Sequence, residues 1–293
     1  MSENIIEVNN LKKYFGKKVK AVDGISFNIE KGEVFGFLGP NGAGKTTTIR
    51  CLMDFIRPTE GEIKILGKDA HKDETELKKS IGYLSGNVRL YDHWTGQMHI
   101  DFYRKLNGNH DIADKLIKDF DFDPSRKTHH LSSGNRQKLG LILALMFEPE
   151  VLIFDEPTNA LDPLLQNYVY EILESATEKG TTVFMSSHNM AEVERICDRV
   201  GIIRNGKMAA TESIMAMKEK KIYTVRVYFE EKFNKEDFKG DGAKIVKDHK
   251  NGLILKVKGG IDPILKKINQ YKVKDLEITQ ASLEDIFMEY YEK

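Results

Sequence analysis

The 293-residue sequence has two cysteines, no long apolar run and no excess of charge of either sign. Cys51 and Cys197 are far apart, so they form no metal or redox motif and suggest buried thiols in a reducing compartment. The longest apolar run, residues 139–147, is about half of what a membrane span needs. The N-terminus, with Glu3 and Glu7, is not a signal peptide. We therefore expect a cytoplasmic chain that leaves any membrane crossing to another chain.

The balanced charge also bears on partners. Lys plus Arg total 45 and Asp plus Glu total 45, which gives a formal net charge of zero. Bulk electrostatics therefore does not favour a polyanion, and we expect no nucleic acid as a partner. The length accommodates one large domain and a small one.

The most informative stretch is a glycine-rich run at residues 39–47. It reads Gly-Pro-Asn-Gly-Ala-Gly-Lys-Thr-Thr and fits the phosphate-binding pattern G-x-x-x-x-G-K-[ST]. An apolar strand at residues 33–38 precedes it, and a helix that ends at Pro58 follows it. Backbone N–H groups and the positive end of a helix dipole bind phosphates in this setting. The sequence therefore predicts binding of a nucleoside triphosphate.

Individual roles follow from this pattern. Lys45 is expected to reach the terminal phosphates, and Thr46 to bind a magnesium ion. A chance match is the alternative, and we reject it because so constrained a pattern is rare at ordinary glycine content. The expected nucleotide contacts in the loop are Gly39, Asn41, Gly42, Ala43, Gly44, Lys45, Thr46 and Thr47.

Two acidic residues and a histidine follow later strands. Apolar residues 151–154 lead into Asp155 and Glu156, and a strand at 181–185 runs towards His188. Open α/β sheets bind ligands at the carboxyl ends of their strands. We expect Asp155 to hold magnesium through water, Glu156 to polarise the attacking water and His188 to sense the γ-phosphate. Alone, the acidic pair fits a helix start equally well, and a lone histidine is more often structural.

The order of elements predicts the fold class. From residue 5 to about 215, strand-like runs alternate with helical segments, which indicates an α/β core with a mostly parallel sheet. Residues 87–145 are expected to form an inserted helical subdomain. Apolar residues at period two then begin a small α+β domain. The expected domains are residues 1–217 and 218–293.

Short signals mark turns and helix starts. Asp162 before Pro163 begins a helix, as an N-cap followed by proline at the first position. Asn-Gly pairs at 205–206 and 251–252 predict hairpins. Ser282, with an acidic residue three positions later, predicts a last helix.

Residues 131–138 read Leu-Ser-Ser-Gly-Asn-Arg-Gln-Lys and precede an apolar helix that Pro149 ends. With this segment the chain resembles the nucleotide-binding subunits of ABC transporters, whose signature it matches in a variant form. The phosphate loop, the signature, the acidic pair, the loop 159–162 and His188 occur in the family's order. The resemblance covers roughly the first three quarters of the chain and implies a P-loop NTPase core of the ABC type.

The resemblance implies ATP and Mg²⁺ as cofactors and a head-to-tail dimer of two ATPase subunits. Ser132 and Gly134 of one subunit would contact the γ-phosphate held by Lys45 of the other, at a helix N-terminus that offers N–H donors. Ser133 and Asp162 are included among the nucleotide contacts. A serine-glycine helix cap is the alternative for the signature taken alone.

Two positions leave alternatives open. By the resemblance Phe15 stacks on adenine, with Tyr14 as the fallback and a core role for either ring as the alternative. The family also carries a glutamine, two residues after the strand 81–84, that binds magnesium and senses the transport partner. Gly86 occupies that place here, and Asn87 either substitutes for it or forms a plain turn. Slow turnover is a hypothesis that follows.

Two segments indicate the subgroup of ABC ATPases. The tail 281–287 and the run 136–141 resemble the single-core ATPases of drug, antibiotic-peptide or sodium exporters. These ATPases pair with a separate membrane permease, so the resemblance implies ATP-driven export from the inner face of the cell membrane. The tail argues against an importer. The alternative function is an ABC ATPase that acts as a mechanical or regulatory module without a permease.

An apolar stripe bears on the permease contact. Tyr91, Trp94, Met98 and Phe102 recur at spacings of three and four residues. Either the stripe packs inside the helical subdomain, or Tyr91 and Trp94 help line a groove for a cytoplasmic helix of the permease.

Overall fold

The computed structural model describes residues 3–16, 18–108, 111–219, 222–240, 242–280 and 287. The chain divides into two compact units, Met1–Glu212 and Ser213–Lys293, and each is described by itself. Helix α8 (Ile214–Glu219) begins the second unit. The boundary expected after Met217 would therefore fall inside this helix.

A six-stranded sheet forms the centre of the larger unit. Its strands are β10 (Lys207–Ser213), β9 (Arg199–Arg204), β3 (Val34–Leu38), β8 (Thr182–Ser187), β7 (Val151–Asp155) and β6 (Ile81–Leu84), in that spatial order. Strand β3 pairs in parallel with β8 and β9, and β7 with β6 and β8. The central strands are buried throughout, as expected for a parallel sheet covered on both faces. The predicted α/β core is confirmed.

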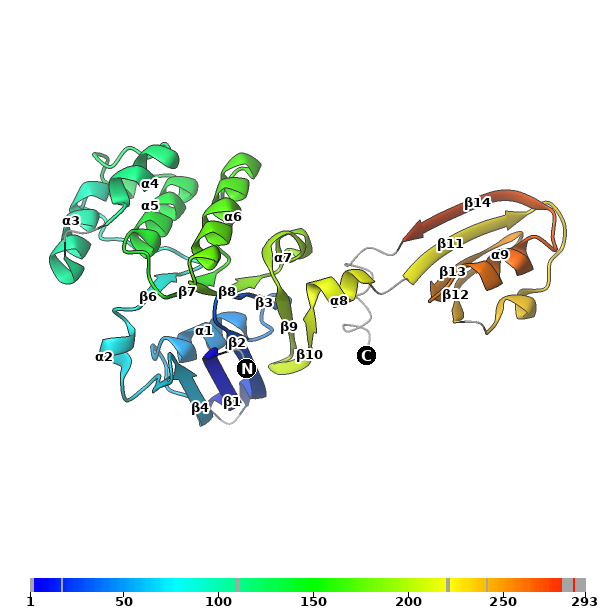
Figure 1. Ribbon diagram of the computed structural model, residues 1–293, viewed down its shortest axis with the longest axis horizontal. Coiled ribbons are helices and arrows are strands. Elements are labelled where there is room, and N and C mark those ends of the chain that lie inside the picture. Colours follow the sequence, from blue (N-terminus) through cyan, green and yellow to red (C-terminus); the bar gives the residue numbers. More distant parts are fainter. Residues whose placement is uncertain are drawn as a thin grey trace. The chain divides into compact units, whose positions relative to one another are not determined.

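A second, antiparallel sheet was not predicted. It has the order β2 (Val19–Glu30), β1 (Asn4–Phe15), β4 (Glu60–Ile65) and β5 (Lys68–Asp69). Helix α1 (Lys45–Leu52) lies on the same side of the parallel sheet as this second sheet (Figure 1). Phe27 of β2 stacks on Phe35 and Phe184, with ring centroids 5.5 and 5.8 Å apart. One apolar core therefore joins the two sheets.

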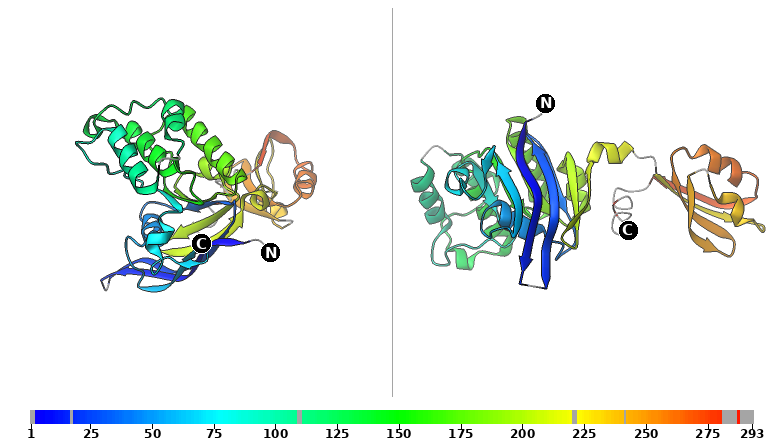
Figure 2. Two further views of the ribbon diagram at one scale, coloured as in Figure 1. Left: turned by 60° about the vertical axis from the view of Figure 1, so that its left-hand side comes forward. Right: turned by 90° about the horizontal axis from the view of Figure 1, so that it is seen from below.

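Helices cover the other face of the parallel sheet. They are α3 (Gly96–Asn107), α4 (Ala113–Asp119), α5 (Ser133–Leu145), α6 (Pro163–Glu178) and α7 (Met190–Ile196), with a 3-10 turn η1 (Thr128–His130). The short α2 (Glu74–Leu77) instead lies on the side of the antiparallel sheet, where Leu77 joins the apolar core. In Figures 1 and 2, α3, α4 and α5 group together as a helical layer. Asp162 caps α6 by accepting the N–H groups of Leu164 and Leu165, as predicted.

After α8, the described part of the smaller unit forms an antiparallel sheet with helix α9. Its order is β12 (Ala243–His249), β13 (Gly252–Lys258), β11 (Ile222–Phe229) and β14 (Val273–Gln280), accompanied by η2 (Lys235–Phe238) and α9 (Asp262–Ile268). Alternate residues of β11 are fully buried, including Val225 and Val227, and they pack with Ile264 of α9. The helix predicted at Ser282 falls outside the described residues.

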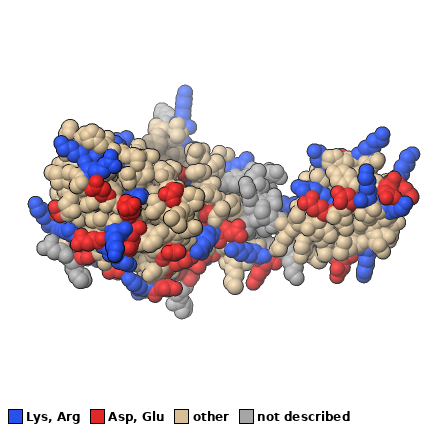
Figure 3. Space-filling view, turned by 90° about the horizontal axis from the view of Figure 1, so that it is seen from above, with Lys and Arg blue, Asp and Glu red and all other residues tan. Residues whose placement is uncertain are grey.

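Charged side chains are mixed on the surface of the larger unit. On the face shown in Figure 3, Lys and Arg lie among Asp and Glu. Exposed pairs such as Lys179 with Glu148, at 2.8 Å, contribute only about 0–1 kcal/mol each. The mixed charges on this face agree with the formal net charge of zero. Exposed ion pairs therefore stabilise the fold less than the apolar cores do.

The core of the smaller unit can be tested with matched valines. Val227→Ala removes two methyl groups from a fully buried site and is expected to cost about 2 kcal/mol. Val246→Ala, at a site that is 61% exposed, should change stability by less than about 0.5 kcal/mol. Hydrogen exchange of the β11 and β13 amides in the full-length chain measures both. Equal effects of the two substitutions would contradict this assignment of the core.

Candidate nucleotide-binding and hydrolysis site

The glycine-rich loop lies between β3 and α1, and its backbone requires glycine at two positions. A Cβ atom at Gly39 would lie 2.5 Å from the carbonyl oxygen of Ile203. Gly44 has φ of 115°, and a Cβ there would lie 2.5 Å from the Ala21 oxygen. Both contacts are too short for any side chain. The local pattern that sequence analysis recognised is therefore also enforced by packing against β2 and β9.

Lys45 is held inside this loop although it carries a charge. Its side chain is only 5% exposed, and Nζ donates to the carbonyl oxygen of Gly39 at 2.7 Å. The Oε1 atom of Glu156 lies 3.5 Å from the same ammonium group. The buried cation is thus compensated by oxygen atoms of its own loop and by one carboxylate, as a buried charge must be.

Thr46 and Asp155 meet directly. The Thr46 hydroxyl donates to Asp155 Oδ2 at 2.8 Å, and the Ser186 hydroxyl donates to Oδ1 at 2.5 Å. Asp155 is 4% exposed. One hydroxyl and one carboxylate are hard oxygen donors of the kind that Mg²⁺ takes from a protein while it keeps waters and substrate phosphates. No larger cluster of His, Cys, Asp and Glu suited to a metal occurs in the part of the chain that is described.

Glu156 and His188 are brought together from different strands. Nδ1 of His188 lies 3.1 Å from Glu156 Oε1. Glu156 has φ of 53°, a left-handed conformation that is uncommon for residues other than glycine. Its N–H donates to the Ser186 carbonyl and hydroxyl oxygens at 3.1 and 3.2 Å, which holds this conformation. The structure therefore gathers Lys45, Glu156 and His188 around one point.

The signature begins helix α5. Ser132 is the N-cap and accepts the N–H of Asn135 at 3.3 Å, as the helix-cap alternative describes. Ser133 lines a cavity of about 410 Å³ whose described lining includes none of residues 39–47. A Cβ at Gly134 would lie 2.9 Å from the Ala160 oxygen, so the signature packs against the loop that follows Glu156.

The aromatic candidates differ in their surroundings. Phe15 is 46% exposed and is not part of the core, and Lys13 Nζ lies 5.2 Å from its ring centroid. Tyr14 instead donates to Asp23 Oδ1 at 2.5 Å, which raises the pKa of the tyrosine. Phe15 is therefore the ring that remains available for stacking.

Gly86 lies beside the Asp155 carboxylate. A Cβ at this position would lie 3.3 Å from both Cγ and Oδ2 of Asp155. The position therefore faces the proposed magnesium site, but glycine supplies no ligand there. Asn87 lines the 410 Å³ cavity with the signature, and its N–H lies 3.4 Å from the Ser85 hydroxyl in a local turn.

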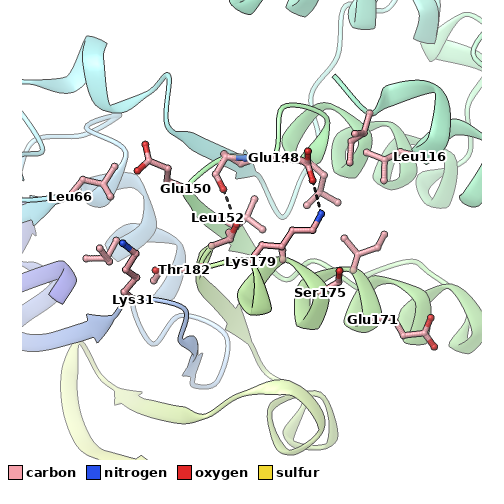
Figure 4. Close-up of a pocket in the computed structure, with 18 of the residues that line it drawn as sticks. Lys31, Leu66, Leu116, Glu148, Glu150, Leu152, Glu171, Ser175, Lys179 and Thr182 are labelled. Carbon is pink, nitrogen blue, oxygen red and sulfur yellow. Dashed lines mark hydrogen bonds and ion pairs between the residues drawn. The ribbon is translucent and has the colours of Figure 1, made fainter. Parts of the chain in front are cut away.

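A larger cavity lies elsewhere. It has a volume of about 750 Å³ and is lined at the starts of β7 and β8, among others by Glu150, Leu152 and Thr182 (Figure 4). Lys179 and Glu148 form an ion pair in its wall. The loop 39–47, Asp155 and Glu156 are at the opposite, carboxyl ends of the strands. The chemistry of the side chains, and not cavity size, therefore locates the site.

These features define the class of protein as a P-loop nucleoside triphosphatase. The family described as "ABC transporter" matches residues 22–159, and the family "ATP-binding protein DrrA1-3-like, C-terminal domain" matches residues 211–291. The chain belongs to the ABC transporter ATP-binding proteins. It binds ATP and is an ATP hydrolase of that family.

Similar proteins support this assignment over most of the chain. The bacitracin transport ATP-binding protein BcrA of Bacillus licheniformis is 37% identical over 70% of this chain and 68% of its own length. The uncharacterized ABC transporter ATP-binding protein YhcH of Bacillus subtilis is 32% identical, over 98% of this chain and 96% of its own length. A solved ATP-binding subunit of an ABC transporter has a TM-score of 0.68 at 27% identity and covers 73% of this chain and 92% of its own.

The position of Gly86 beside the proposed magnesium site can be tested by introducing a side chain that can bind the ion. Gly86→Gln is expected to lower the Mg²⁺ concentration that gives half-maximal ATP hydrolysis, because it adds an amide oxygen to a side chain that starts beside the Asp155 carboxylate, provided that Asp155 shifts slightly to admit the Cβ atom. Asn87→Ala should leave this concentration unchanged if Asn87 only forms a turn. Magnesium titrations of hydrolysis measure both variants. No change in either variant would mean that the loop takes no part in ion binding.

Proposed function

We propose that this chain binds Mg²⁺ and ATP between two head-to-tail copies, and that ATP-driven closure of the dimer powers export through a separate membrane permease. The observation that supports the proposal most directly is that Glu156 Oε1 lies close to both Lys45 Nζ and His188 Nδ1. The hydrogen-bonded pair of Thr46 and Asp155 belongs to the same site. The Drr-like C-terminal family match and relatives such as the daunorubicin resistance protein DrrA3 of Streptomyces coeruleorubidus, 34% identical over 72% of this chain, support the exporter subgroup.

Each side chain of the site has its own role in ATP hydrolysis. Lys45 exchanges the loop carbonyls for the terminal phosphates, because a phosphate is the stronger partner for a buried ammonium. Thr46 and Asp155 would hold Mg²⁺, which neutralises phosphate charge when bound. Glu156 orients and polarises the attacking water, and His188 hydrogen-bonds the γ-phosphate. Phosphoryl transfer requires little more than such positioning and charge stabilisation.

The signature supports the composite site. Ser132 and Ser133 are exposed at the N-terminus of α5. A helix N-terminus offers N–H donors and a positive dipole end to an anion. We therefore infer that Ser132, Ser133 and Gly134 complete the γ-phosphate site of a second copy or of a similar subunit. Asp162, which caps α6 at the end of the loop 159–162, is retained among the proposed nucleotide contacts.

The dimer is tested with Glu156→Gln, which should bind ATP but hydrolyse it slowly and so retain the closed state. Light scattering after size-exclusion chromatography is expected to show a monomer without ATP and a dimer with ATP. The double variant that adds Ser132→Ala should need more ATP to dimerise, while Lys45→Ala should not dimerise. A Glu156→Gln chain that stays monomeric with ATP would contradict the homodimer.

The permease contact is assigned to an exposed aromatic face. Tyr91 is 62% exposed, its ring lies 4.6 Å from that of Trp94, and Trp94 packs edge-on against Phe102 at 5.5 Å. Met98, also on α3, is 47% exposed. Full burial of the stripe inside the helical layer is therefore not supported. An exposed apolar cluster of this kind suits an amphipathic helix of a partner.

A buried histidine holds this face in place. His99 is 4% exposed, and its Nε2 accepts the backbone N–H of Tyr91 at 3.1 Å. Its Nδ1 lies 2.8 Å from the Thr95 carbonyl oxygen, so Nδ1 carries the proton and the ring is neutral. Burial lowers the pKa of His99, which favours this neutral form. The loop that follows Gly86 is thereby fixed to the start of α3.

No helix of the described residues has the length and apolar character that spanning a bilayer demands. We therefore place membrane passage in the permease and the ATPase at the inner face of the cell membrane. The second candidate is an ABC ATPase without a permease, acting as a mechanical or regulatory module. Detergent pull-down from its own membranes separates the two, since only a transporter subunit should retain a polytopic membrane protein.

Trp94→Ala is expected to weaken or abolish that retention while ATP affinity stays unchanged, because it removes the centre of the aromatic face and lies outside the phosphate loop. Val19→Ala, at an exposed apolar site on the antiparallel sheet, is the matched control and should retain the permease. Co-purification and nucleotide titration are measured on the same preparations. Loss of both permease and ATP affinity in Trp94→Ala would indicate a packing role instead.

A further inference from the structure

One buried carboxylate near the site has no part in the mechanism above. Glu192 of helix α7 is 3% exposed. Burial raises the pKa of Glu192, and the hydroxyl groups of Ser187 and Thr158 oppose the rise. A buried acid of this kind costs free energy unless both of its oxygen atoms are satisfied. Its presence therefore calls for a physical reason.

Both oxygen atoms of Glu192 accept a hydroxyl hydrogen bond. Thr158 Oγ1 donates to Oε1 at 2.7 Å, and Ser187 Oγ donates to Oε2 at 2.5 Å. The Ser187 oxygen also accepts the N–H of Asn189 at 2.9 Å, and its hydroxyl has the Asn189 carbonyl oxygen as a second, more distant acceptor at 3.2 Å. Thr158 and Ser187 are themselves buried, and the bridge is thus shielded from water.

The two donors come from the two segments that carry the reactive groups. Thr158 is two residues beyond Glu156, and Ser187 is immediately before His188. These segments also meet through the Glu156–His188 contact of 3.1 Å, where the histidine is 56% exposed. The Thr158–Glu192–Ser187 bridge is a second, buried connection between these segments, and hydrogen bonds that are shielded from water are stronger than exposed ones.

The opposite side of the same loop is also held. Gln137 of helix α5 is 5% exposed, and its Nε2 donates to the Pro157 carbonyl oxygen at 2.8 Å. The backbone after Glu156 is therefore fixed between the signature helix and α7. With Gln137 on one side and Glu192 on the other, the placement of Glu156 depends on both connections.

We propose that Glu192 is a positioning residue for ATP hydrolysis: by accepting the hydroxyls of Thr158 and Ser187, it sets the separation between the segments that carry Glu156 and His188. It touches neither nucleotide nor water and acts only through these two segments. The inference rests on the proposed roles of Glu156 and His188. An error of about 1 Å in such a site can cost on the order of 100-fold in rate, which makes the bridge consequential.

The test is steady-state ATP hydrolysis by the full-length chain with Glu192→Gln. The amide keeps the shape but can accept only one of the two hydroxyl protons. We expect kcat to fall about 10- to 100-fold, while the ATP affinity measured by nucleotide titration is unchanged, because residues 39–47 are not altered. Glu194→Gln, the same change at an exposed position of the same helix, should leave both quantities at their wild-type values.

A double-mutant cycle with Thr158→Val separates positioning from general stability. Thr158→Val removes one hydroxyl, leaves the carboxylate and nearly preserves volume, so it alone should lower kcat. Because both substitutions break the same bridge, the double variant should be no slower than the slower single variant. If Glu192→Gln does not fold, as judged by circular dichroism, the Thr158→Val and Ser187→Ala variants decide the question by their kcat.

An unchanged kcat in Glu192→Gln, a parallel loss of ATP affinity, or fully additive effects in the cycle would each overturn the proposal. These outcomes would overturn the positioning role of Glu192 and leave the proposed function intact. The proposed function would fail if the wild-type chain did not hydrolyse ATP and the Glu156→Gln variant did not dimerise with ATP. The positioning role of Glu192 would then fail with it.

Discussion

The parallel register of three strands is the constraint on which the site depends. Strand β3 pairs with β8 so that Leu38 stands opposite Ser187, and β7 pairs with β8 so that Asp155 stands opposite Ser186. Three chain segments that are distant in sequence therefore leave the sheet at the same edge. A one-residue slip would turn the end residues to the other face and separate the groups around Lys45.

Holding these groups together has costs that the surrounding structure offsets. Lys45 is a buried cation, Glu156 has a left-handed backbone, and Asp155 is a buried anion. Each is compensated by oxygen or hydroxyl groups of its neighbours, with Ser186 serving both Asp155 and the N–H of Glu156. Strain and charge concentrated at one edge of a sheet, and compensated there, are typical of a site prepared for a charged ligand.

The region around Gly86 connects this chemistry to the surface. Gly86 faces Asp155, the loop that follows it reaches Tyr91, and His99 fixes Tyr91 to helix α3. In the proposed function, a permease helix bound to the aromatic face would act on a loop that begins beside the proposed magnesium ligands.

Local sequence determined much of this protein. The phosphate loop, the helix start at Asp162, the Asn-Gly hairpin at 205–206 and the alternation of β11 were each predictable, because turn chemistry, capping and periodicity act over a few residues. The antiparallel sheet was missed: β1 and β2 are neighbours in sequence and pair with Phe15 opposite Val19, but β4, which extends the sheet, follows only after β3 and α1. Only the tertiary structure decided that Phe15 is exposed while Tyr14 is engaged by Asp23, and that Glu192 joins Thr158 to Ser187. Such contacts link residues through the packing of separate elements, and no local pattern records them.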